Sequence, residues 1–223
     1  MANITLDIET LPCDDAALIE EIKASVKPPR TLKKAESIAA WWKEEGDAAQ
    51  AEAVARTSLN GMYGRICCFG WKIGDAPAAS ISGGDEADLI ASFFDVMRHA
   101  AMVDHYSKPV SCHRVIGHNI AGFDLRFLWQ RAVVHQIARP ACIPWKAKPW
   151  DDSINDTMLM WSPDRDSRIS LDKLCKLLGI ASSKGDLDGS KIAQAWADGR
   201  QSEIAEYCRS DVEATYLCWQ RMF

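Results

Sequence analysis

The chain has 223 residues, of which 48% are hydrophobic and 26% charged, and these proportions exclude a disordered, collagen-like or membrane-embedded protein. Its length allows one large domain or two small ones. The 31 acidic residues outnumber the 26 basic ones, so the formal net charge of −5 at pH 7 excludes a protein that holds nucleic acid through bulk positive charge.

The N-terminal sequence MANITLDIET has neither the basic nor the apolar region of a secretory signal. No later stretch approaches the roughly 18 apolar residues of a membrane span. The 8 cysteines include no C-x-x-C spacing, and reduced, buried thiols are their simplest interpretation. We therefore expect a cytoplasmic protein without membrane contacts.

The first expected element is a strand that ends before Pro12. Ile4, Leu6 and Ile8 alternate with polar residues and should face the core, whereas Asp7 and Glu9 share the other face. Taken alone, this acidic pair is a weak signal, because such pairs recur by chance in an acidic chain.

A helical segment is expected next. A short helix capped by Asp14 or Asp15 should extend to about Lys27. Residues 27–58 are rich in Ala, Glu and Lys, with apolar positions at helical spacing, which predicts a helical insertion interrupted near Gly46.

The rest of the chain alternates strands and helices. Two β-rich runs, residues 65–73 and 78–82, are separated by turn residues and predict a hairpin. The later expected elements are a helix over 85–106, a buried strand over 110–116, a helix over 122–137, an irregular connection over 138–168 with a short apolar piece at 157–161, and helices over 170–179, 190–197 and 202–219. This order predicts one α/β domain over residues 1–223, a mixed sheet with helices on both faces.

Three acidic segments are candidates for chemistry. Asp7 and Glu9 lie on one side of a strand, roughly 7 Å apart at Cα, and repel each other unless a hard cation or a shared proton relieves them. The alternative is a solvated face of an edge strand.

The second segment contains Asp124, the last residue of the sequence GHNIAGFD. This sequence follows a buried strand and opens a helix, where the helix dipole favours an anion. The alternative is an ordinary aspartate at a helix N-terminus.

The third segment is the helical pair Tyr207 and Asp211, which are four residues apart and so share one helix face. The alternative for the tyrosine is a core position.

Together these segments resemble the DEDDy branch of the 3′-5′ exonuclease superfamily. The resemblance is strongest to the predicted exonucleases related to the proofreading domain of family B DNA polymerases. It rests on Asp7-Ile8-Glu9, on Asn119-x3-Phe123-Asp124 and on Tyr207-x3-Asp211, in the order of the family. Weaker similarities, among them Asp156-Thr157, extend it over essentially the whole chain.

The resemblance implies a ribonuclease H-like, five-stranded mixed sheet and a metal-dependent site. The implied ligands of two divalent cations, Mg²⁺ or Mn²⁺, are Asp7, Glu9, Asp124 and Asp211. With these four carboxylates, the resemblance implies a catalytic Tyr207, which would hydrogen-bond the attacking water. The implied substrate contacts are Thr10, Leu11, Asn119 and Phe123. Two divalent cations can activate a water and stabilise the leaving group in phosphodiester hydrolysis.

The implied reaction releases nucleoside 5′-monophosphates from a free 3′ end of DNA, with single strands favoured. Two alternatives stay open: an RNA-processing exonuclease of the same chemistry, and a catalytically silent nucleic-acid-binding module. Composition does not separate DNA from RNA as the substrate. Missing metal ligands would favour the silent module, and none is missing. Protein partners are unknown. Two groups of cations and rings could contact the nucleic-acid backbone or simply be solvated: Lys23, Lys27, Arg30, Lys33 and Lys34; and Trp145, Lys146, Lys148 and Trp150.

Overall fold

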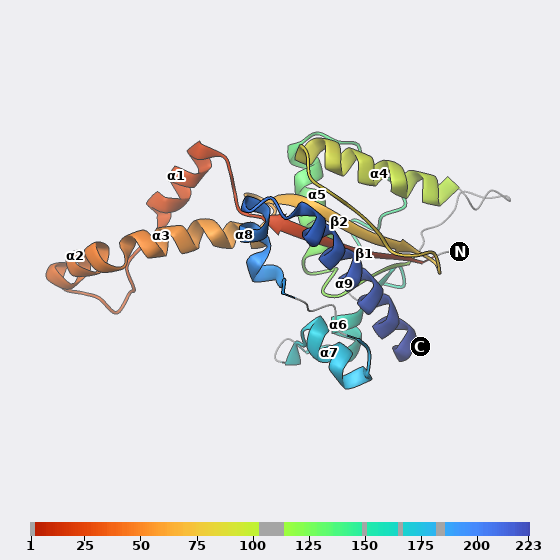
Figure 1. Cartoon of the computed structure of the whole chain (residues 1–223). Helices are drawn as coiled ribbons and strands as arrows, with labels where there is room; N and C mark the ends of the chain where they lie inside the picture. Colours follow the sequence, from red (N-terminus) through yellow and green to blue (C-terminus); the bar gives the residue numbers. More distant parts are fainter. Residues whose placement is uncertain (1–2, 103–113, 149–150, 165–166, 182–185) are drawn as a thin grey trace. The chain divides into compact units, whose positions relative to one another are not determined.

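The computed structural model describes residues 3–102, 114–148, 151–164, 167–181 and 186–223. The chain divides into two compact units, drawn in Figure 1. The sheet unit comprises Met1–Thr10 and Ile66–Phe223, and the helical unit comprises Leu11–Arg65. Whether residues 1–223 act as one exonuclease domain, with an insertion at 27–58, stays a prediction.

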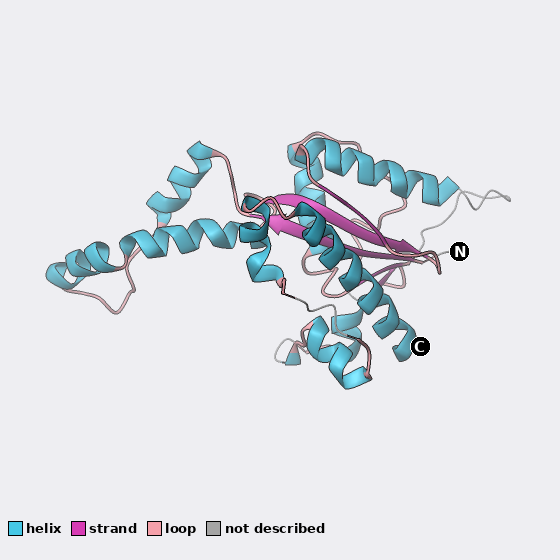
Figure 2. Ribbon diagram, in the orientation of Figure 1, coloured by secondary structure: helices cyan, strands magenta, loops and turns pink. Residues whose placement is uncertain are grey.

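A five-stranded sheet forms the centre of the sheet unit, shown in magenta in Figure 2. In the order β3-β2-β1-β4-β5, the strands are β3 (Ala79–Ser82), β2 (Arg65–Ile73), β1 (Ile4–Leu11), β4 (Val115–Gly117) and β5 (Ile154–Asp156). β4 pairs in parallel with both β1 and β5, whereas β2 and β3 are antiparallel. The predicted mixed five-stranded sheet is confirmed.

The N-terminal part of the sheet follows the predicted pattern. β2 and β3 form the expected hairpin. The Gly74 N–H donates to Asn3 O at one end of β1, and the Cys67 thiol donates to Glu9 O near the other. Because the contact positions run in opposite directions along the two strands, β1 and β2 are antiparallel.

The structure corrects the prediction for residues 138–168, which contain strand β5 inside the expected irregular connection. With three residues, β5 is too short for an alternating pattern, and its pairing with β4 defines it. The apolar piece at Thr157–Trp161 forms helix α6. Of the strand expected over 110–116, residues 110–113 lie outside the described residues, and β4 contains the last two.

Helices cover both faces of the sheet. On the face of Ile4, Leu6 and Ile8, α4 (Glu86–Met102) and α5 (Asp124–Val134) complete the main hydrophobic core. On the other face lies α9 (Gln201–Met222), which contacts β3 and β4.

A glycine in β2 allows α9 to approach the sheet closely. A Cβ atom at Gly70 would lie 2.8 Å from the Cys208 sulfur and 2.9 Å from a Val212 methyl group. Both distances are shorter than van der Waals contact, so only glycine fits this position without a shift of the helix.

Among the residues that the structure describes, the sheet unit also contains α7 (Leu171–Leu178), η3 (Gly189–Lys191) and α8 (Ile192–Ala197). α7 ends as predicted at Gly179, whose φ of 68° is left-handed. α6, α7 and α9 share a small second core that contains Met158, Leu174 and Cys218.

The helical unit contains α1 (Ala16–Ser25), α2 (Ala35–Glu44), α3 (Gly46–Ala55) and η1 (Arg56–Leu59). The Asp15 carboxylate caps α1 by accepting from the N–H groups of Ala17 and Leu18. The predicted interruption near Gly46 is confirmed, because α3 begins there. Among the described residues, every helix is too short or too polar to cross a bilayer.

Candidate active site

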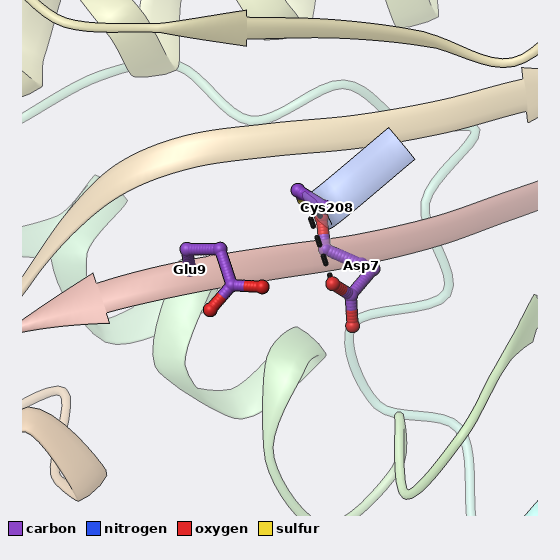
Figure 3. A group of neighbouring side chains, drawn as sticks. All are labelled: Asp7, Glu9 and Cys208. Atoms are coloured by element: carbon purple, nitrogen blue, oxygen red, sulfur yellow. Dashed lines mark hydrogen bonds between the residues drawn. The ribbon is translucent and has the colours of Figure 1, made fainter. Parts of the chain in front are cut away.

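Asp7 and Glu9 project from the same side of β1, as the strand pattern predicts. Figure 3 shows both carboxyl groups together with Cys208, which reaches them from α9. One ligand atom from each of these three residues lies within 4.8 Å of the others. The Cys208 thiol donates to Asp7 Oδ2 at 3.5 Å. The sequence separates these groups by about two hundred residues, and the sheet and α9 bring them together.

Asp124 reaches the same place from α5, where it is the first helical residue and is buried. β1 extends past Gly117, the last residue of β4. In this part of β1, the backbone N–H of Ile8 donates to Asp124 Oδ1 at 3.1 Å. The Asp124 carboxylate therefore accepts a hydrogen bond from the residue of β1 that lies between Asp7 and Glu9.

Tyr207 and Asp211 lie on α9, on either side of Cys208 in the sequence. The negative charge of Asp211 contributes to raising the pKa values of Asp7, Glu9 and Tyr207. The Tyr207 hydroxyl also donates a hydrogen bond to Asp211. The structure thus brings together all five residues expected to form a catalytic site.

Burial and mutual repulsion dominate the electrostatics of this cluster. Burial, followed by the charges of Glu9, Asp124 and Asp211, raises the pKa of Asp7 well above its ordinary value. Burial also raises the pKa of Glu9, with Asp211 as the next cause, and raises the pKa of Asp124 to about 7. Negative charge is therefore concentrated here at an energetic cost.

The donor set fits a hard divalent cation. Carboxylate oxygens are the ligands that Mg²⁺ and Mn²⁺ prefer. In the described part of the chain, no lysine or arginine forms an ion pair with Asp7, Glu9 or Asp124. A cation would balance charges that these side chains leave unbalanced.

The stability of the metal-free protein should fall as the pH rises. Each carboxyl whose folded pKa exceeds its unfolded value of about 4 stabilises the fold fully below that value, and this contribution is lost as the pH rises through the folded pKa. For Asp124 that pKa is about 7. In EDTA we expect the Tm to fall by several degrees between pH 6 and pH 8. Mg²⁺ or Mn²⁺ should raise the Tm more at pH 8, where fewer protons compete.

Thermal scans at pH 6, 7 and 8, with EDTA or with a divalent cation, measure this effect. The matched variant is Asp124→Asn, in which both the pH dependence and the response to the cation should be smaller. A Tm in EDTA that is the same at all three pH values would contradict the expectation.

The sequence indicates Asp156 only through a weak similarity, and the structure shows that this residue supports the turn before Asp124. It is 1% exposed. Its carboxylate accepts from the N–H groups of Asn119 (2.9 Å), Ala121 (3.2 Å), Met158 (3.1 Å) and Leu159 (3.4 Å). Asn119 has a left-handed φ of 63°, so this turn is one that few residues adopt without support.

Removing this acceptor should disturb Asp124 through the turn. In Asp156→Ala, buried N–H groups lose their partner at about 1–3 kcal/mol each, so we expect a Tm several degrees lower. We also expect weaker cation binding, measured by the Tm response to Mn²⁺. Asp188→Ala, which removes the half-buried cap of η3, is the control and should leave the response to Mn²⁺ unchanged. A lower Tm with an unchanged Mn²⁺ response would limit Asp156 to a structural role.

The predicted substrate contacts differ in exposure. Thr10 and Asn119 are half-buried, and Leu11 is 2% exposed. Phe123 is half-buried against the main core, with its ring 5.5 Å from that of Phe127. Contact of these four residues with a substrate stays a prediction.

One family profile, described as predicted 3′-5′ exonucleases related to the exonuclease domain of PolB, matches residues 72–223, more than half of the chain. The chain belongs to this family. The match to this exonuclease family contains Asp124, Tyr207 and Asp211 but begins after Asp7 and Glu9. Asp7 and Glu9 thus lie outside the matched residues, and their place on β1 brings them close to the other carboxylates.

Among solved structures, this PolB-related exonuclease chain is similar to the family B DNA polymerase from the hyperthermophilic archaeon Pyrobaculum calidifontis. The TM-score is 0.57 at 14% sequence identity, over 97% of this chain and 24% of the polymerase chain. At this identity the similarity shows the fold, which is ribonuclease H-like. The chain spans only 24% of the polymerase it matches. No curated protein matches the sequence.

Proposed function

We propose that this protein is a metal-dependent 3′-5′ exonuclease of the DEDDy type. It hydrolyses phosphodiester bonds from the 3′ end of single-stranded DNA and releases nucleoside 5′-monophosphates. The observation that carries the proposal is the crowding of carboxyl groups from β1, α5 and α9 at one place, where burial and the negative charges of neighbouring carboxylates raise the pKa values of Asp7, Glu9 and Asp124.

Asp7, Glu9, Asp124 and Asp211 would hold two divalent cations, Mg²⁺ or Mn²⁺. When bound, such cations stabilise negative charge on phosphoryl oxygens and lower the pKa of a bound water. The family to which the chain belongs supports this assignment, as does the carboxylate-rich donor set.

Tyr207 would orient the attacking water by a hydrogen bond. Burial, with the charges of Asp211 and Glu9, raises the pKa of this phenol above its ordinary value, so the hydroxyl stays protonated at neutral pH. A protonated phenol is a poor general base but a good hydrogen-bond donor. Positioning the water is therefore the role that its chemistry supports.

The preference for DNA rests on the similarity to DNA polymerase exonucleases. The same carboxylates could serve an exoribonuclease, because the proposed chemistry does not involve the sugar 2′ position. A cytoplasmic location belongs to the same proposal. The free cysteines of the described residues are in keeping with a reducing compartment.

A time course on single-stranded DNA and RNA oligonucleotides, labelled at the 5′ or the 3′ end, tests the function. With Mg²⁺ or Mn²⁺, 5′-labelled DNA should shorten stepwise, and 3′-labelled DNA should release labelled mononucleotide at once. EDTA should stop both reactions. Faster degradation of RNA would favour the exoribonuclease, and the absence of degradation of either polymer would contradict the proposal.

A further inference from the structure

A pocket of the sheet unit lies against helix α5, the helix that begins with Asp124. It has a volume of about 260 Å³ and lies between the start of α5 and residues 144–147. Binding pockets for drug-sized ligands are larger, roughly 300–1,000 Å³. The size suits a single flat ring system and its immediate substituents.

Indole rings and cations line this pocket. Trp129 is 41% exposed, and the Arg139 guanidinium lies 5.5 Å from its ring centroid. Trp145 is held in place, because its indole N–H donates to Pro140 O at 3.0 Å and its ring packs edge-on against Phe94. One ring is therefore accessible for stacking and the other is fixed.

The charge of the pocket is opposite to that of the whole chain. Arg126 and Lys146 line it, and no acidic residue is among its lining residues. Within the described ranges, neither these two cations nor Arg139 forms an ion pair with a carboxylate. In a chain of net charge −5, unpaired cations beside accessible rings favour an anionic, aromatic ligand.

The pocket is continuous with the turn that carries Asp124. Its wall includes Ala121 and Leu125, which flank Asp124 in the sequence, and Ala121 also donates to Asp156. Trp129 is five residues beyond Asp124, which corresponds to about 7.5 Å along the helix axis. Trp129 also lies about 140° around the helix from Asp124, so a polynucleotide with one end at Asp124 would pass around the start of α5 to reach this pocket, a path that a few nucleotides can span.

We propose that this pocket binds a base and its phosphate from a single-stranded nucleic acid, on the 5′ side of the bond to be cleaved. The direction rests on the proposed function, because a 3′ end held among the carboxylates leaves only 5′ nucleotides to extend outward. Trp129 stacks on the base, and Arg126, Arg139 and Lys146 attract the phosphates. The pocket would thus hold long substrates more tightly than short ones.

Binding and cleavage by Trp129→Ala and by the double variant Arg126→Ala/Lys146→Ala test this proposal. Binding of fluorescein-labelled dT12 and rU12 is measured by anisotropy in EDTA, which prevents cleavage. Cleavage is measured on the 12-mers and on the p-nitrophenyl ester of thymidine 5′-monophosphate, a substrate with one nucleotide. Trp161→Ala is the matched control, because Trp161 is 43% exposed and does not line the pocket.

Stacking of one base contributes about 1–3 kcal/mol, so Trp129→Ala should weaken 12-mer binding roughly tenfold. The double variant should weaken it and reduce its salt dependence. Hydrolysis of the one-nucleotide ester should be unchanged in both. If the wild type binds dT12 and Trp129→Ala binds it more weakly, the pocket takes DNA. The same result with rU12 means that it takes RNA.

Unchanged 12-mer binding in both variants would overturn the proposal, and so would a loss as large in Trp161→Ala. An equal loss on the one-nucleotide ester would also overturn it, since that result places the effect in the active site. If the wild type cleaves nothing, the proposed function fails, but the anisotropy measurements still decide whether the pocket binds nucleic acid.

Discussion

Replacing Asp7 or Asp211 with asparagine is expected to abolish divalent-cation-dependent nucleotide release, by about 1,000-fold or more, while the protein stays folded. Each substitution removes a carboxylate from a group that must hold cations and offset phosphoryl charge. The rate of mononucleotide release from single-stranded DNA measures the loss. Near-normal activity in either variant would contradict the site assignment.

Asp7→Asn should not destabilise the metal-free protein. Asp7 repels Glu9, Asp124 and Asp211 when it is ionised, and a neutral amide relieves that repulsion. We therefore expect the Tm of Asp7→Asn in EDTA at pH 8 to equal or exceed that of the wild type. Mn²⁺ should raise its Tm less than it raises the Tm of the wild type.

Glu206→Gln is the matched control for the acidic substitutions. Glu206 is exposed on α9, directly before Tyr207, and pairs with Arg209. Exposed pairs of this kind contribute little to stability. Normal activity in Glu206→Gln would show that removing negative charge near the motif is not in itself inhibitory.

Tyr207→Phe is expected to lower kcat roughly 10- to 100-fold and to change KM much less, because the hydroxyl orients the water and does not hold the substrate. Steady-state kinetics on an oligonucleotide separate the two constants. A pure increase in KM would assign Tyr207 to substrate binding. The pKa of Tyr207 is raised, so its hydroxyl should not ionise near pH 10. We therefore expect kcat to depend on pH in this range in the same way in the wild type and in Tyr207→Phe.

Tyr216→Phe is the control for this prediction, because Tyr216 lies on the same helix but bonds elsewhere. Its hydroxyl donates to Asp75 Oδ1 at 2.6 Å. The loss of that bond should lower the Tm slightly and leave kcat unchanged. An equal decrease in kcat in both variants would indicate a general disturbance of α9.

Much of the fold follows from local sequence patterns. The alternation of Ile4, Leu6 and Ile8 predicts β1 and places Asp7 and Glu9 on its other face, because side chains alternate along a strand. The turn residues after Ile73 predict the hairpin, and Gly179 predicts the end of α7. Each of these features depends on neighbours along the chain, which a single sequence contains.

Only the tertiary structure identified the features that depend on distant partners. β5 has three residues and exists through its pairing with β4. Asp156 becomes important because the turn at Asn119 presents N–H groups to it. The Cys208 thiol meets Asp7 because Gly70 lets α9 approach the sheet.

The sequence by itself determined which residues could form an acidic site, since residue type, spacing and order along the chain are enough for that prediction. Only the tertiary structure decided that Asp7, Glu9, Asp124 and Asp211 lie within electrostatic reach of one another. It also decided that the pKa values of Asp7, Glu9 and Asp124 are raised. The physical reason is that desolvation and repulsion depend on distance and burial, and both are created when β1, α5 and α9 pack together.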